Sequence, residues 1–110
     1  SFVTLNDEAY VEFAQALAHR IYAEGGESMA DRLKFALQLT LVQPVDAHQL
    51  ATLIELFDGE LAEYRKAPND AKELFGKTVP VPDGASLPEM AALTVVANVL
   101  LNLDAILMKG

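Results

Sequence analysis

The sequence predicts an all-α fold, an antiparallel bundle of four main helices plus one short helix. Apolar residues recur every three or four positions along the long segments, as they do on one face of an α-helix. Before several of these segments a Ser or Asp is followed three residues later by an acidic or amide residue, the pattern of an N-terminal capping box. With 52% hydrophobic residues in 110 positions, the chain can bury a core of its own. Residues 1–110 are therefore expected to form a single helical domain.

The first helix is predicted over residues 7–24. Asn6 or Asp7 can cap its start, and Gly25-Gly26 can end it. Its core-facing side is expected to carry the apolar residues Tyr10, Phe13, Ala14, Leu17 and Ile21.

The second helix is predicted over residues 29–42. Ser28 and Asp31 form its capping pattern, and Pro44 has to end it. Apolar residues cover most of its circumference, which predicts a central, well-buried helix.

The third helix is predicted over residues 47–66, with Asp46 and Gln49 as its capping box. Its apolar seam consists of Leu50, Ile54, Phe57, Leu61 and Tyr64. Gly59 lies on the other side of this helix and costs about 1 kcal/mol relative to Ala, so a kink or a close contact is expected there.

The last part of the chain is predicted to form a short helix over residues 69–75, an irregular connection over 76–87 and a final helix. Pro68 suits the first turn of the short helix. Ser86 and Glu89 cap the final helix, which continues to Leu107.

The final helix is the most apolar segment, because residues 90–103 contain no charge. One ridge is formed by Leu93, Val96, Leu100, Leu103 and Leu107, and a second stripe of small or amide side chains by Ala91, Thr94, Asn98, Asn102 and Ala105. Two interpretations stay open. The helix can be the core element of the bundle, with its amides satisfied inside the fold, or its amide stripe can dock a further domain or a second subunit.

Composition excludes several classes of function. A formal net charge of −8 and a pI near 4.5 argue against nucleic-acid binding, which needs clustered Lys and Arg. No run of about 20 uncharged apolar residues is present, so no membrane insertion is expected. The absence of cysteine excludes disulfides, zinc-thiolate sites and covalent attachment of haem c within this segment.

No catalytic, cofactor-binding or metal site is predicted. His19 and His48 lie on different helices and lack a metal-ligand spacing. A phosphate-binding loop is not expected at Gly76-Lys77-Thr78, because the upstream glycine is missing. A solvated acidic face is expected from Glu55, Asp58, Glu60 and Glu63. The isolated domain is therefore not expected to be an enzyme.

Two ends of the chain nevertheless resemble a known family. Phe2-Val3-Thr4-Leu5-Asn6-Asp7, then Tyr10-Val11-Glu12 and residues 14–20, and finally residues 93–104 with their Asn-x-x-x-Asn-x-Asp pattern, are similar to the C-terminal part of the domain of unknown function 1553. The chain departs from the family at Val42-Gln43-Pro44, where Gly-Arg commonly precedes the proline, and at His48-Gln49, where a Glu is common.

The resemblance implies a parent protein and a location. Members are large planctomycete-type proteins, usually with a cytochrome c-like haem domain ahead of this one, so it implies a C-terminal fragment of a protein exported to the periplasm or cell surface. Haem c is then expected in the parent protein and not in this segment. For individual residues the resemblance implies only structural or interface roles, at Asn6, Asp7, Asn98, Asn102 and Asp104.

Three hypotheses follow for function. The first is a non-catalytic helical scaffold or interaction domain that packs on other domains of the parent chain through an uncharged patch around the last helix. The alternative is that the same five polar residues line part of an enzyme active site, redox or polysaccharide-related, which other domains complete. A third hypothesis is a homodimer through the final helix or through the seam of the third helix.

Overall fold

The structure confirms the all-α fold. A computed structural model describes residues 8–40, 44–75 and 79–109, with the side chains of 11–40, 44–75 and 79–102. Over this part of the chain the elements are α1 (Glu8–Glu24), α2 (Met29–Thr40), α3 (Ala47–Lys66), α4 (Pro68–Phe75) and α5 (Leu87–Lys109). The predicted bounds agree closely, although the expected end of the second helix at 42 lies outside the described residues.

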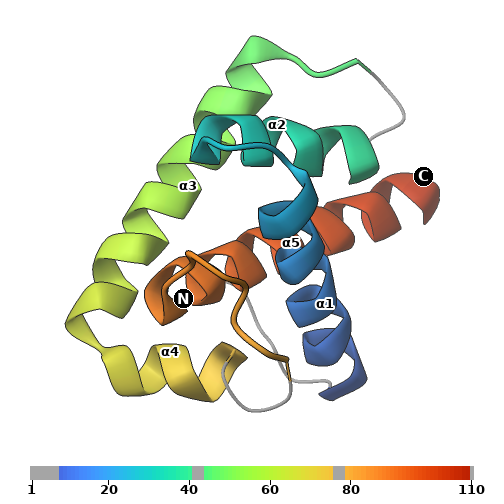
Figure 1. Cartoon of the computed structure of the whole chain (residues 1–110). Helices are drawn as coiled ribbons and strands as arrows, with labels where there is room; N and C mark the ends of the chain where they lie inside the picture. The colour runs from blue at the N-terminus through green and yellow to red at the C-terminus, as the bar shows by residue number, and fades with distance from the viewer. Residues whose placement is uncertain (1–7, 41–43, 76–78, 110) are drawn as a thin grey trace.

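The helices are arranged around α5 (Figure 1). α5 packs mainly against α1, α3 and α4, and to a lesser extent against α2. The prediction of a central second helix is wrong, because α2 buries only Leu33, Ala36 and Leu37 and leaves Phe35 and Leu39 partly exposed. The central helix is the one with no charge over residues 90–103. Apolar side chains are tolerated on every face of a helix only where that helix is inside the fold. The antiparallel order of the predicted bundle stays a prediction.

The helix starts confirm three of the predicted caps. The Ser28 hydroxyl accepts from the Asp31 backbone N–H at 3.1 Å. Asp46 and Gln49 form a complete capping box. Ser86 and Glu89 do the same, with Ser86 N donating to Glu89 Oε1 at 2.9 Å and Glu89 N donating to Ser86 Oγ at 3.3 Å. These bonds satisfy backbone donors that a helix start otherwise leaves unpaired.

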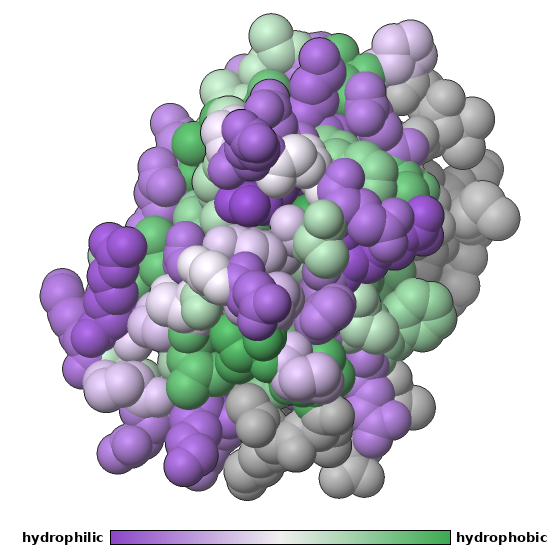
Figure 2. All heavy atoms as spheres, viewed as in Figure 1, coloured by the Kyte–Doolittle hydropathy of each residue, from purple (hydrophilic) through white to green (hydrophobic). Residues whose placement is uncertain are grey.

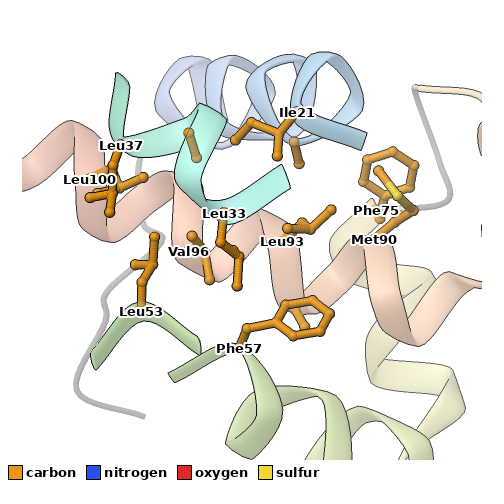
Figure 3. Close-up of a cluster of buried hydrophobic side chains, with 13 residues drawn as sticks. Ile21, Leu33, Leu37, Leu53, Phe57, Phe75, Met90, Leu93, Val96 and Leu100 are labelled. Carbon is orange, nitrogen blue, oxygen red and sulfur yellow. The ribbon is translucent and has the colours of Figure 1, made fainter. Parts of the chain in front are cut away.

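One core holds the elements together (Figure 3). Ile21 from α1, Leu33 from α2 and Phe57 from α3 surround Leu93 and Val96 of α5. At the start of α5, Phe75 of α4 lies beside Met90, and both side chains are fully buried. Because the α3 seam faces this core, a dimer through that seam would compete with the packing of the chain itself.

The corner between α1 and α2 needs both of its glycines. A Cβ on Gly25 would lie 2.8 Å from the Arg32 Cα and 2.5 Å from the Ile21 carbonyl oxygen, and Gly26 has a φ of +118°. The Arg32 Nε donates to the Tyr22 carbonyl oxygen at 3.0 Å, and the guanidinium lies 3.9 Å from the centre of the Tyr22 ring. The two helices are therefore joined by a tight turn with a cation–π contact across it. Gly59, in contrast, has open space around it, so the close contact expected there is absent.

The predicted core face of α1 is partly wrong. Ala14 and Ile21 are buried as predicted, but Phe13 is 65% exposed and the polar Gln15 is buried instead. The Gln15 Nε2 donates to the Leu74 carbonyl oxygen in the last turn of α4. A helix end leaves its last carbonyls without helical partners, so this bond explains why an amide is tolerated on the inner face of α1.

Most of the surface visible in Figure 2 is hydrophilic, and hydrophobic residues gather low on that face, near the place where α5 begins in Figure 1. Of the large hydrophobic side chains described, Phe13 and Val81 are exposed. Within the described residues, none of the helices has the length and apolar character needed to cross a membrane.

Candidate functional site

The polar stripe of α5 lies inside the fold along most of its length. Ala91, Thr94 and Asn98 are all fully buried, as are Leu93 and Val96 on the other ridge. The Thr94 hydroxyl donates to the Met90 carbonyl oxygen at 2.7 Å, within the same helix. Over residues 90–98 the stripe is therefore part of the core, as the first of the two interpretations predicts.

Asn98 and Asn102 form a linked pair with opposite surroundings. The Asn102 Nδ2 donates to both the carbonyl oxygen and the Oδ1 of Asn98, each at 3.0 Å. Asn98 is fully buried, whereas Asn102, one helical turn further on, is exposed. The Asn98 Nδ2 has no hydrogen-bond partner among the described residues. A buried donor without a partner costs about 1–3 kcal/mol, so Asn98 is a costly residue in an otherwise apolar helix.

Of the five polar residues singled out in the sequence, Asn98 and Asn102 have described side chains, and these two lie together. Asn6 and Asp7 lie outside the described residues, and so does the side chain of Asp104, although its backbone belongs to α5. A shared cleft lined by all five stays a prediction.

The histidines and the acidic residues of α3 lie at or near the surface of the molecule. His48 is exposed in the first turn of α3, and His19 is partly buried on α1. On α3, Glu55, Asp58 and Glu63 are exposed and Glu60 is partly buried, so three of the four carboxylates expected on a solvated face are exposed. Within the part of the chain that the structure describes, no cluster of His, Cys, Asp or Glu has the arrangement to hold a metal ion.

Tyr64 is the residue with a perturbed acidity at the junction of α3 and α4. Partial burial raises the pKa of its phenol, and the nearby carboxylates Glu60 and Asp70 raise this pKa further. A phenol is protonated at neutral pH even at its ordinary pKa, so this upward shift disfavours a nucleophilic role for Tyr64.

The sequence placed Phe13 on the wrong face of α1 and gave no role to Gln15. A weak signal exists, because Val11, Gln15, Ala18 and Tyr22 also share a helical face. The predicted stripe includes the large side chains of Phe13 and Leu17, whereas the observed inner face has the small Ala18 beside Ala14. Close approach of two helices favours small residues at the contact.

Comparisons with models of protein families, with curated proteins and with solved structures find no match to this chain.

Proposed function

We propose that this chain is a non-catalytic helical interaction domain that docks on other domains of a larger exported protein through the far end of α5. The resemblance of residues 2–7, 10–12, 14–20 and 93–104 to the domain of unknown function 1553 supports such a parent protein. In this proposal the parent carries a cytochrome c-like domain and works outside the cytoplasm, and its haem c binds there. The present domain contributes a folded, closed scaffold and a docking surface.

The observation that supports docking is the change in exposure along α5. From Met90 to Leu100 the helix is buried, with only Val99 partly exposed, whereas Leu101 is partly exposed and Asn102 is exposed. The helix nevertheless runs on to Lys109, and its last turns contain Leu103, Ala105, Ile106, Leu107 and Met108. Of residues 103–109, five are apolar and two, Asp104 and Lys109, are charged. A largely apolar helix end of this kind is typical of a segment that packs on another surface.

The proposed docking surface at the end of α5 is smaller than the uncharged patch around the whole last helix that the sequence predicts. Asn98 belongs to the core and cannot contact a partner while the helices around it stay packed. Asn102 lies at the boundary of the buried segment and can take part in the contact. The two asparagines therefore separate a folding role from a docking role.

The test compares two substitutions to the same residue. Asn102→Arg should leave the domain folded, as seen in its circular dichroism, but weaken its affinity for the remainder of the parent protein about tenfold or more, measured by titration calorimetry. Asn98→Arg should unfold the domain, because it buries a charge among apolar side chains at a cost of several kcal/mol.

Gln38→Arg on α2 is the matched control, since Gln38 is an exposed amide residue and the change in charge is the same. This variant should bind like the wild-type chain. If Asn102→Arg binds as tightly as Gln38→Arg, the end of α5 is not the docking surface. If the wild-type chain does not bind the remainder of the parent protein at all, the proposal that it is an interaction domain is wrong.

The alternative, a contribution to an active site in the parent protein, has less support. Its one favourable observation is the Asn98 Nδ2, a donor without a partner among the described residues. A substrate group could use this donor only after α5 separates from its neighbours, because Asn98 has no exposed surface. Loss of parent-protein activity in Asn98→Leu, with binding and folding unchanged, would favour this alternative.

A further inference from the structure

The outer face of α1 carries an aromatic residue that the core does not use. Phe13 is 65% exposed in the middle of the helix, and Glu12, Ala16 and Arg20 are exposed beside it. Figure 1 shows α1 at the edge of the molecule, packed on α5 and α2. At helix interfaces a large side chain of one helix commonly packs into the space beside a small residue of the other. Phe13 and Ala16 provide such a large and a small residue on one face.

The charges on this face are arranged symmetrically about Ala16. Glu12 precedes Ala16 by four residues and Arg20 follows it by four. At 3.6 residues per turn, the two charged residues lie about 6 Å along the axis from Ala16 and about 40° to either side of it. A two-fold axis at Ala16, with two α1 helices antiparallel, therefore brings each Glu12 level with Arg20 of the other helix, diagonally across the contact.

We propose that the outer face of α1 binds a second copy of this chain in an antiparallel, two-fold symmetric pair centred on Ala16. The interface is self-complementary, because Glu12 of each copy pairs with Arg20 of the other, which gives two equivalent ion pairs. Ala16 at the centre lets the helix axes approach to about 8 Å. This inference is independent of the docking surface on α5.

Phe13 gains a partner in the same arrangement. It lies about 60° from Ala16, on the same side as Arg20, by the helical spacing of 100° per residue. In the antiparallel pair, Phe13 of one copy comes level with Arg20 of the other to within about one residue's rise. The guanidinium and its aliphatic stem can then cover the exposed ring as they lie beside Glu12.

Arg20 is free enough within its own copy to make this contact. Its Nε lies 3.4 Å from the Glu24 Oε1, in an ion pair whose side chains are 54% and 57% exposed. Exposed pairs one helical turn apart contribute little, so exchanging this pair for one between copies has a small cost.

The test is a charge swap followed by sedimentation equilibrium. The wild-type chain should show a concentration-dependent dimer. Glu12→Arg alone and Arg20→Glu alone each place like charges opposite one another and should raise the dimer dissociation constant about tenfold or more. The double variant Glu12→Arg with Arg20→Glu restores opposite charges and should recover most of the wild-type affinity. It also keeps the net charge at −8.

Two further variants separate the interface from general effects. Glu55→Arg on α3 has the same change in charge at a distant exposed site and should leave the dimer unchanged. Ala16→Arg should abolish the dimer and leave the circular dichroism of the helices intact, because Ala16 is exposed. A wild-type chain that is monomeric up to millimolar concentration overturns the proposal. So does a dimer that neither single charge reversal weakens, or one that the double variant fails to restore.

Discussion

α1 and α5 pack against each other, yet they hold their place in the fold in different ways. α5 has no charge between Met90 and Leu103 and is enclosed by the other helices over most of this length. α1 is enclosed on one side only, where Ala14, Ala18 and Ile21 face the core, and its opposite side exposes Phe13. A long uncharged stretch thus predicts a buried helix, and it does not matter which face is assigned to the core. For a helix buried on one side only, a prediction must also say which face points to the core.

The largest expected effect sharpens this contrast between the two helices. Leu93→Ala on α5 removes most of a fully buried side chain and should lower the free energy of unfolding by about 2–5 kcal/mol. Phe13→Ala on α1 removes a larger side chain but should change this free energy by less than about 0.5 kcal/mol, because the ring is mostly in water.

Urea denaturation of both variants, at a concentration where the chain is monomeric, measures this difference. Equal losses of stability would mean that Phe13 packs in the folded monomer and that the rotation of α1 described above is wrong. The measurement at low concentration also keeps any self-association through Phe13 out of the comparison.

The same contrast explains how far the sequence determines the fold. Capping residues such as Ser28, Asp46 and Ser86 predict the helix starts, because their hydrogen bonds are local and depend on few neighbours. The central helix does not follow from apolar breadth alone, because α2 and α5 both have apolar residues around most of their circumference. α5 has no charge over residues 90–103, whereas α2 carries Asp31, Arg32 and Lys34. That difference decides which of the two helices can be surrounded on every side.

The outward rotation of Phe13 could not be predicted from periodicity alone. The stripe through Phe13 and Leu17 and the stripe through Gln15 and Ala18 have the same helical spacing. What favours the second is a carbonyl at the end of α4, Leu74, which needs a donor and which the fold brings next to Gln15. This contact joins residues 59 positions apart, so no local pattern contains it.

A second prediction tests that contact on the inner face of α1. Gln15→Met keeps a side chain of similar length but removes the donor, which leaves the Leu74 carbonyl oxygen without this bond. The free energy of unfolding should fall by about 1–3 kcal/mol, the cost of an unpaired buried polar group. Thermal or urea unfolding measures the change.

The matched control for this variant is Gln38→Met, at an exposed amide residue of α2. It should leave stability within about 0.5 kcal/mol of the wild type. If both variants behave alike, the bond from Gln15 does not stabilise the fold, and the burial of Gln15 needs another explanation.

The smallest expected effect concerns the polar residue within the apolar helix, and its sign is opposite. Asn98→Leu replaces the amide with an apolar side chain of the same branching, and it removes a buried donor that has no partner among the described residues. The Asn102 amide keeps the Asn98 carbonyl oxygen as an acceptor. The variant should therefore be more stable than the wild type by about 1 kcal/mol.

Asn102→Leu is the control for this last substitution, because Asn102 is exposed and the change should be close to neutral. A loss of more than about 1 kcal/mol in Asn98→Leu alone would mean that the amide is held by contacts that a larger apolar group cannot replace. A higher free energy of unfolding would mean that Asn98 destabilises the fold and that the apolar packing of the rest of α5 compensates for it. An enclosed helix can carry one such residue because its neighbours Leu93, Val96 and Leu100 are all buried, whereas α1, with only one buried face, has a polar residue inside only where a backbone carbonyl meets it.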